Sequence, residues 1–251
     1  MKHILLFIIA SIFIFSCSSN KNIIYMQDLD SNKDYSSKFD LYLVKVDDIL
    51  KIDVNAETPE TALIFNPNAL NPNFNKDALI YNGYQVNSDG FINFPSLGKI
   101  KVEGKNIDEI RDYIYTTIRD KGVLVDPSVD VKLLNTHFIV LGEVNSPGRY
   151  EYIKNNLNLL EAIGMASDLT INGKRDDIKI IRTINGMRSV RSVDLTKSDF
   201  LNSKSFQIMS GDIIIVNPNK TKVKQAGIIG NSGTLLSLLS FILSSIIVIS
   251  N

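Results

Sequence analysis

Residues 39–218 contain two groups of short strand-like runs, and each group includes one short segment with helical spacing. In the first group, Asn106 and Glu109 form an N-x-x-E pattern ahead of isoleucines at helical spacing. In the second, Asn158 and Glu161 repeat that spacing. The pattern is a relative of the capping box that opens helices. One helix for each group of short strands predicts an α+β fold, in which a single helix covers one face of each small mixed sheet.

Turn signals separate the runs and set the expected unit bounds. Asp89-Gly90 is a turn dipeptide between short apolar runs, and Asn185-Gly186 is placed to close a hairpin. Residues 56–83 form a Pro/Asn-rich excursion that contains several large apolar side chains, so we expect it to be partly ordered against a neighbour. The expected units are 39–134 and 135–218.

Composition narrows the possible functions. The chain has 251 residues, with 27 basic and 27 acidic side chains. A formal net charge of zero argues against nucleic acid as a partner, because phosphate binding requires a basic excess. One cysteine, Cys17, and two histidines exclude a cysteine metal cluster and a multi-histidine zinc site. We therefore expect neither a metal nor a cofactor.

The N-terminus is typical of an export signal. Residues 1–16 carry Lys2 and then a short apolar run, of signal-peptide length rather than membrane-span length. Ile14-Phe15-Ser16-Cys17 resembles a bacterial lipobox, which implies cleavage before Cys17 and covalent lipid on that residue. The alternative is an ordinary signal peptide with an incidental cysteine. Residues 17–38 read as a polar tether, and the lack of an aspartate after Cys17 favours the outer membrane, with the body in the periplasm.

The C-terminus is apolar. After a linker at 219–227, residues 228–251 carry no ionisable side chain, which predicts a membrane-spanning helix. Its small residues share one sector, either for close helix packing or as the lining of a pore, and both alternatives require another copy. The pore-lining candidates are Gly233, Ser237, Ser240 and Ser244, and the lipid-facing candidates are Leu235, Leu239, Ile242 and Ile246.

No arrangement of residues predicts an enzyme. His137 precedes an apolar strand and is expected to be structural. The pairs Asp47-Asp48 and Asp176-Asp177 are adjacent along the chain, and neighbours on a strand point to opposite faces, so they make poor acid/base partners. A basic group could face an acidic sugar or could simply be a solvated hairpin; its members are Lys174, Arg175, Arg182, Arg188 and Arg191.

Several motifs together resemble the polysaccharide export outer-membrane lipoprotein family. In the first unit Tyr42 and Val44 lead into Asp47-Asp48-Ile49-Leu50, with Asp47 where glycine is usual. The most specific match follows, at Asp89, Gly90, Pro95, Gly98 and Gly104. The second unit resembles the family's soluble-ligand-binding β-grasp domain, at Gly142, Pro147, Gly148, Gly211 and Asp212. There Ser167-Asp168 falls where Gly-Gly is common.

The resemblance implies a ring-shaped homo-oligomer under the outer membrane, which exports capsular or extracellular polysaccharide from the periplasm to the cell surface. It implies an inner-membrane polysaccharide co-polymerase as partner, often fused to a tyrosine kinase. It also shifts the expected role of the C-terminal small residues toward pore lining. The alternative is a lipoprotein on the periplasmic face that binds glycan or scaffolds an envelope complex without forming a pore.

Overall fold

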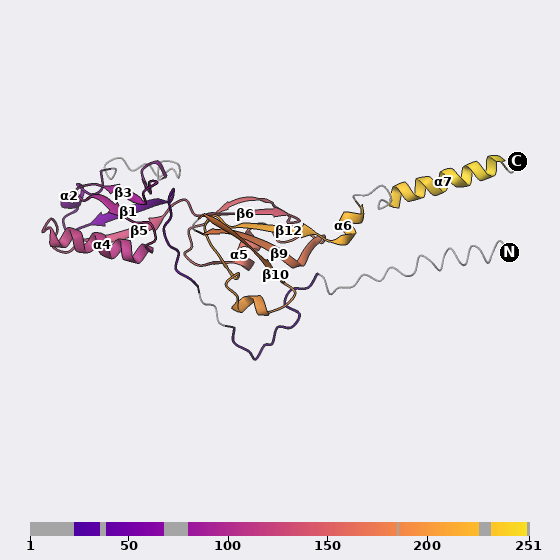
Figure 1. The fold of residues 1–251 in the computed structure, drawn as a ribbon, viewed down its shortest axis with the longest axis horizontal. Coiled ribbons are helices and arrows are strands. Elements are labelled where there is room, and N and C mark those ends of the chain that lie inside the picture. The colour runs from indigo at the N-terminus through magenta and orange to yellow at the C-terminus, as the bar shows by residue number, and fades with distance from the viewer. Residues whose placement is uncertain (1–22, 36–38, 68–79, 185, 226–231, 250–251) are drawn as a thin grey trace.

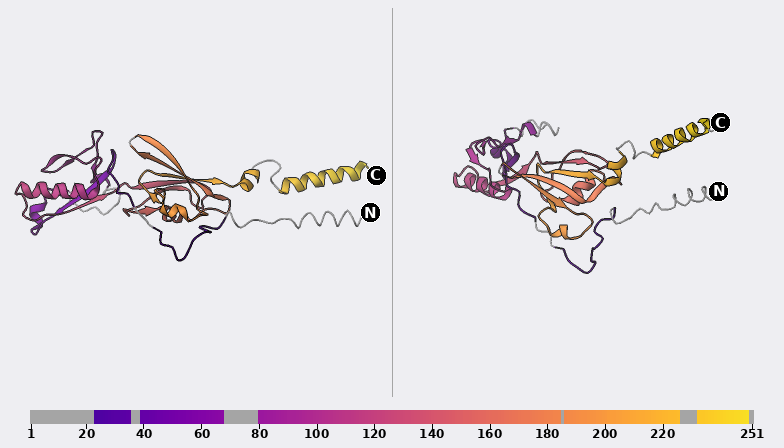
Figure 2. Two further views of the ribbon diagram at one scale, coloured as in Figure 1. Left: turned by 60° about the horizontal axis from the view of Figure 1, so that its bottom comes forward. Right: turned by 45° about the vertical axis from the view of Figure 1, so that its right-hand side comes forward.

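The computed structural model describes residues 23–35, 39–67, 80–184, 186–225 and 232–249. Two folded units follow one another along the long axis, as Figures 1 and 2 show from three directions. Each unit has its own cluster of buried apolar side chains. The chain is therefore built from two separate cores.

The first unit has a three-stranded antiparallel sheet in the order β2-β1-β5. Its strands are β1 (Ile49–Asn55), β2 (Tyr84–Gln85) and β5 (Ser128–Leu133), and beside it lies the hairpin of β3 (Phe91–Phe94) and β4 (Gly98–Lys101). The Asp89-Gly90 turn is present, but β3 pairs with β4 rather than with β2. The described strand pairs of this unit are all antiparallel, so the prediction of a mixed sheet is wrong here.

The helix of the first unit is α4 (Ile107–Asp120), and it begins where the N-x-x-E pattern predicts. The Asn106 side chain accepts from the Glu109 backbone N–H, and the Glu109 carboxylate accepts from the Asn106 N–H, both at 2.9 Å. Its three inward isoleucines are fully buried against the sheet. These are Ile110, Ile114 and Ile118.

The excursion between β1 and β2 is partly ordered, as expected. It contains the short helix α2 (Pro59–Ala62), and Phe65 is fully buried in the first core, where its ring stacks on that of Phe94. Asn66 exchanges two hydrogen bonds with the backbone of Val54. The middle of the excursion, 68–79, lies outside the described residues.

The second unit has a five-stranded mixed sheet in the order β10-β9-β12-β6-β7. Its strands are β6 (His137–Gly142), β7 (Gly148–Glu151), β9 (Gly173–Ile184), β10 (Met187–Val193) and β12 (Ile213–Pro218). The first and last of them, β6 and β12, pair in parallel, while the neighbouring pairs are antiparallel. A mixed sheet was predicted, and here it is confirmed.

One helix covers this sheet. The helix α5 (Leu159–Met165) begins with a second capping box, made by Asn158 and Glu161. Its buried residues share one core with the inward side chains of β6, β9 and β12. The short pair β8 (Leu157–Asn158) and β11 (Gln207–Ile208) and the 3₁₀ helix η2 (Asp199–Asn202) complete the unit. The α+β class is confirmed.

Two helices follow the second unit, α6 (Lys220–Gln225) and α7 (Ser232–Ile249). A helix thus occupies part of the expected linker 219–227. Within the described part of the chain, no helix has both the length and the apolar character that a membrane crossing requires. The prediction of a membrane-spanning helix over 228–251 is therefore not supported.

Candidate functional site

A tight turn leads into β1 and carries the first family-motif aspartate. Asp47 has a φ of +68°, in the left-handed region, and its carboxylate accepts from the Gln85 side-chain amide. Asp48 is buried, and its carboxylate accepts from the Lys45 backbone N–H at 2.8 Å and from the Tyr42 hydroxyl at 3.0 Å. Burial raises the pKa of Asp48, and these two hydrogen bonds offset only part of that effect.

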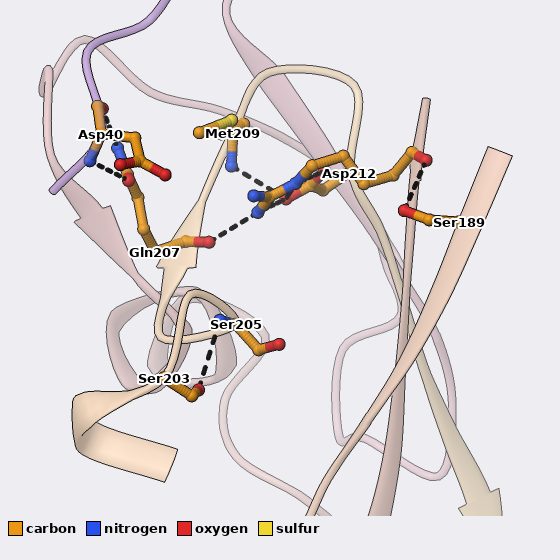
Figure 3. A network of polar contacts seen from close by, with 8 residues as sticks. Asp40, Ser189, Ser203, Ser205, Gln207, Met209 and Asp212 are labelled. Atoms are coloured by element: carbon orange, nitrogen blue, oxygen red, sulfur yellow. Dashed lines mark hydrogen bonds and ion pairs between the residues drawn. The ribbon is translucent and has the colours of Figure 1, made fainter. Parts of the chain in front are cut away.

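A turn of the same design leads into β12. Gly211 has a φ of +89°, and the carboxylate of Asp212 accepts from the Met209 backbone N–H at 2.8 Å, as Figure 3 shows. Asp212 also forms an ion pair with Arg182, with the guanidinium Nη2 at 2.7 Å and Nε at 2.9 Å. Both side chains are buried, at 1% and 7% exposure. Arg182 lies on the inward face of β9 with Ile178 and Ile180. The period-2 alternation of these residues is a sequence signal for its burial, and the prediction of a basic group did not use it.

The network around Asp212 extends to the segment that enters the first unit. Arg182 Nη2 donates to the Gln207 carbonyl at 2.6 Å. The Gln207 side chain accepts from the Asp40 N–H at 2.7 Å and donates to the Asp40 carbonyl at 2.8 Å (Figure 3). A second link joins the units, because the Asn135 side chain accepts from the Ile49 N–H and donates to the Asp47 carbonyl. Nothing in the sequence indicated Gln207 or Asn135 as connecting residues.

A cavity of about 430 Å³ lies where the two units meet. We call it the interdomain cavity. The first unit contributes the start of α4 and part of β5, and the second unit contributes the loop 152–156 and residues 207–209. Leu41 and Tyr42, from the connecting segment, complete the lining. Both units therefore contribute side chains to the lining of this cavity.

The lining of the interdomain cavity combines phenol, amide and paired charged groups. Burial is the main cause that raises the pKa values of Tyr42 and Tyr152, so both phenols stay protonated and neutral near neutral pH. The charged side chains of the lining form ion pairs with close neighbours, at 2.5 to 2.6 Å. The pairs are Asp108–Arg111, Asp130–Lys132 and Lys154–Glu161, of which Glu161 lies outside the lining.

The family-motif residues of the first unit cluster at the β3–β4 hairpin. The Gly90 carbonyl accepts from the backbone N–H groups of Val102 and Glu103, which ties the Asp89-Gly90 turn to the end of β4. Gly90 has a φ of +79°, a conformation that L-residues adopt at a cost. The other motif residues also lie at turns or strand starts of this hairpin, and they are Pro95, Gly98 and Gly104.

Gly142 ends β6 and is the most restricted glycine of the second unit. Its φ is +93°, and a Cβ atom there would lie 2.0 Å from the Val216 carbonyl oxygen. The close approach of β6 and β12 therefore requires glycine. Pro147 and Gly148 lead into β7, where Gly148 pairs with Val140. These motif residues shape the sheet rather than supply reactive groups.

Residues 23–35, within the expected tether, lie along the second unit; we call them the strap. Met26 and Gln27 donate their backbone N–H groups to the carbonyls of Leu195 and Thr196, at 2.9 and 2.8 Å. Tyr25 packs over the guanidinium of buried Arg175, and its hydroxyl donates to the carboxylate of Asp168. A polar tether was predicted over residues 17–38, and nothing in that prediction indicated this packing on the second unit.

Asp168, which contacts the strap, is part of a departure from the family pattern. Ser167 and Asp168 have φ values of +60° and +69°, at the positions where the resembled family commonly has glycines. Aspartate tolerates this conformation because its side chain can bond locally. Asp168 accepts from the Leu169 backbone N–H at 2.6 Å, and also from Tyr25.

The basic residues of the second unit, which could have lined a face for an acidic sugar or formed a solvated hairpin, do not form one exposed group. Arg175 and Arg182 are buried and bond to backbone carbonyls, so their assignment to an exposed face is wrong. Lys174 pairs with Asp177. Two arginines of β10 remain at the surface, Arg188 and Arg191.

Within the described residues, no group of three or more histidine, cysteine, aspartate or glutamate side chains could hold a metal ion. His137 Nδ1 lies 3.0 Å from the Asn135 carbonyl oxygen, at the start of β6. Asp177 interacts with Lys179 and Ser192, which lower its pKa to about 2. Asp176 is exposed beside it. Each of these contacts is local to its own strand or hairpin.

Several predicted residues lie outside the described part of the chain. They include the signal segment 1–16, Cys17 and the side chains of Leu235, Leu239 and Ile246. On α7, the hydroxyls of Ser240 and Ser244 donate to carbonyls of the same helix, at 2.9 and 2.8 Å. Gly233, Ser237 and Ile242 are exposed in the isolated chain.

Comparison with known proteins gives one result for each unit. Residues 37–134 match the polysaccharide biosynthesis/export protein family, and residues 136–216 match the SLBB domain family. The EPS I polysaccharide export outer membrane protein EpsA of Ralstonia solanacearum is 32% identical over 158 residues, which are 61% of this chain and 41% of that protein. EpsA of Ralstonia nicotianae is 31% identical over 159 residues, with the same two shares. The chain thus spans about two fifths of the length of these relatives. The resemblance to the polysaccharide export family is thus confirmed, with an export domain and an SLBB domain matched in succession.

Proposed function

We propose that this protein is a polysaccharide export component of the outer membrane. In this proposal it forms an oligomeric channel that passes capsular or extracellular polysaccharide from the periplasm to the cell surface. The observation that carries the proposal is the direct succession of an export domain and an SLBB domain, in a chain whose relatives are named polysaccharide export outer membrane proteins.

The structure supports a role in positioning rather than in chemistry. The family-motif residues Asp48, Gly142 and Asp212 hold turns and close strand contacts, and the links through Gln207 and Asn135 fix one unit against the other. A fixed pair of units is suited to repeat around a ring of identical subunits. We propose a homo-oligomer on these grounds, without catalytic activity.

The remaining parts of the proposal concern attachment and partners. We propose that Cys17 carries lipid after removal of residues 1–16, and that the body lies in the periplasm. We also propose that the inner-membrane partner is a polysaccharide co-polymerase, with or without an attached tyrosine kinase. Attachment by several acyl chains gives stable anchoring, whereas a single chain is marginal.

A clean gene deletion tests the export role. Polysaccharide is measured separately at the cell surface and in the periplasm. We expect the surface polymer to fall and the periplasmic polymer to rise, and we expect the full-length gene to restore both. A copy that ends at Lys224 tests whether α7 is needed. Unchanged surface polymer, in a strain without a second exporter, would overturn the proposal.

A second candidate function is a lipoprotein that binds glycan or scaffolds an envelope complex without a pore. The observation in its favour is the interdomain cavity, whose lining includes the exposed amide side chains of Asn155 and Asn156. Electron microscopy of the purified full-length chain separates the two functions. Rings with an open centre support the channel, and monomers support the scaffold.

A further inference from the structure

We propose that the interdomain cavity binds a short, uncharged stretch of saccharide. This inference rests on the proposed function, because it narrows the cargo to a chemical class and gives that cargo a place on the chain. Four features of the cavity carry it: its size, its apolar surfaces, its free amides and its balanced charge.

Size and apolar surface come first. A volume of about 430 Å³ lies within the ordinary range of small-ligand pockets. Tyr42 and Tyr152 both line the cavity, while Leu41 and Ile153 remain 68% and 87% exposed beside them. A sugar ring presents a patch of C–H groups that can cover apolar and aromatic surface, and burial of such surface is favourable.

The hydrogen-bonding groups of the lining match hydroxyls. Asn155 and Asn156 are exposed on the loop 152–156, and the structure assigns neither side chain a hydrogen bond within the described residues. An amide side chain both donates and accepts, as a sugar hydroxyl does. The carboxylates of Asp108 and Asp130 have lone pairs beyond those used in their ion pairs, and both are largely exposed.

The charge of the lining selects against an acidic ligand. Arg111, Lys132 and Lys154 each lie within 2.6 Å of a carboxylate, so the positive charge of the lining is already compensated by acidic partners. The uncharged side chains of the lining that can meet a ligand include the amides of Asn155 and Asn156 and the rings of Tyr42 and Tyr152. An uncharged segment rich in hydroxyls fits this set, and a polyanion would have to displace existing ion pairs.

The test uses the full-length purified chain and defined probes. Binding of maltohexaose and laminarihexaose, both neutral, is compared with binding of hexagalacturonate, which is acidic, by saturation-transfer NMR and titration calorimetry. We expect at least one neutral probe to bind and the acidic probe to bind more weakly. The double variant Asn155→Ala/Asn156→Ala should weaken neutral binding by about tenfold or more, because two hydrogen bonds to the saccharide are lost.

The matched control is Asn93→Ala, since Asn93 is an exposed asparagine on β3, away from the cavity. It should bind like the unaltered chain. Any of three results overturns the inference: no neutral probe binds, the acidic probe binds best, or the double variant binds as well as the control. If a second copy of the chain fills the cavity instead, the double variant alters the sedimentation of the oligomer and the neutral probes do not bind. The export proposal is judged separately, by the gene deletion, so either can fail without the other.

Discussion

The two aspartate turns that lead into β1 and β12 share one backbone design. In each, a residue with positive φ precedes a buried aspartate, and that aspartate accepts the N–H of the residue three positions earlier, at 2.8 Å in both turns. They differ in the next partner. Asp48 has the phenol of Tyr42, whereas Asp212 has the guanidinium of Arg182.

The difference shows how the surroundings of a turn determine the partner of its carboxylate. Asp212 lies inside the second unit at 1% exposure, where an ionised carboxylate needs a cation to offset its desolvation. Asp48 lies at the junction of the units, with a neutral phenol as its donor, and its pKa is raised. In the same local structure, the carboxylate of Asp212 forms an ion pair, whereas the carboxylate of Asp48 accepts a hydrogen bond from a neutral phenol and has a raised pKa.

The largest expected effect comes from removing the cation of the second turn. Arg182→Met leaves the carboxylate of Asp212 buried without its partner, and we expect a loss of about 3–5 kcal/mol in the free energy of unfolding. Hydrogen exchange at the amides of β9 and β12 measures it within the second unit. Arg188→Met, at an exposed position on β10, is the control and should change stability little. A loss below about 1 kcal/mol would mean that the ion pair is not needed.

Removing the carboxylate of the first turn should have a smaller effect. Asp48→Ala leaves the N–H of Lys45 and the hydroxyl of Tyr42 without their acceptor, which we expect to cost about 2 kcal/mol. Hydrogen exchange at the amides of β1 measures this change. Asp53→Ala, on the same strand but half-exposed, is the comparison. If Asp48→Ala costs as much as Arg182→Met, then the two turns are energetically alike and the contrast between them is false.

Substitution of the residue with positive φ in each turn tests the comparison of the two backbones. Gly211→Ala places a Cβ on a residue with a φ of +89°, and we expect a loss of about 1 kcal/mol. Asp47→Gly relieves the same conformation in the first turn, and we expect a gain of a few tenths of a kcal/mol, reduced by the lost contact with Gln85. Thermal unfolding of both variants checks the two signs. If both substitutions changed the stability in the same direction, the two turns would differ in their backbone requirements.

The smallest expected effect is a pH dependence of opposite sign at two carboxylates. Because burial raises the folded-state pKa of Asp48 above 3.8, its contribution to stability is full below that pH and falls as pH rises through the folded-state value. Asp177, with a pKa of about 2, contributes fully above 3.8 and loses that contribution as pH falls toward 2. Asp48→Asn and Asp177→Asn should therefore change the slope of stability against pH in opposite directions. Equal slopes in titrated unfolding curves would contradict this assignment.

Local patterns in the sequence predicted local structure well. Both capping boxes form at the predicted residues, and the Asp89-Gly90 turn is where the dipeptide places it, because caps and turns depend on residues within a few positions. The pairing of Asp212 with Arg182 joins residues 30 positions apart, and the Asp40–Gln207 contact joins residues 167 apart. Contacts between residues so far apart in the sequence depend on the tertiary fold, and the spacing of residues along the chain does not predict them.

The candidate site illustrates the same limit. The interdomain cavity is assembled from segments that begin at Leu41 and end at Met209, and several of its residues lie in loops without a distinctive pattern. Two motif residues that the sequence did indicate bond to residues of this lining, Asp48 to the Tyr42 hydroxyl and Asp212 to the Met209 backbone N–H. A family motif therefore located the framework of the site but not its lining.

The strap along the second unit also decides how the chain responds to tension. Its hydrogen bonds to Leu195 and Thr196, together with the contact between Tyr25 and Asp168, lie between residue 23 and the first unit. A force applied at the N-terminal end of the strap is therefore carried first by the second unit, through Asp168, Leu195 and Thr196. Tension reaches the first unit only after these contacts have broken, so the strap protects the fold of the first unit from a pull at the N-terminal side.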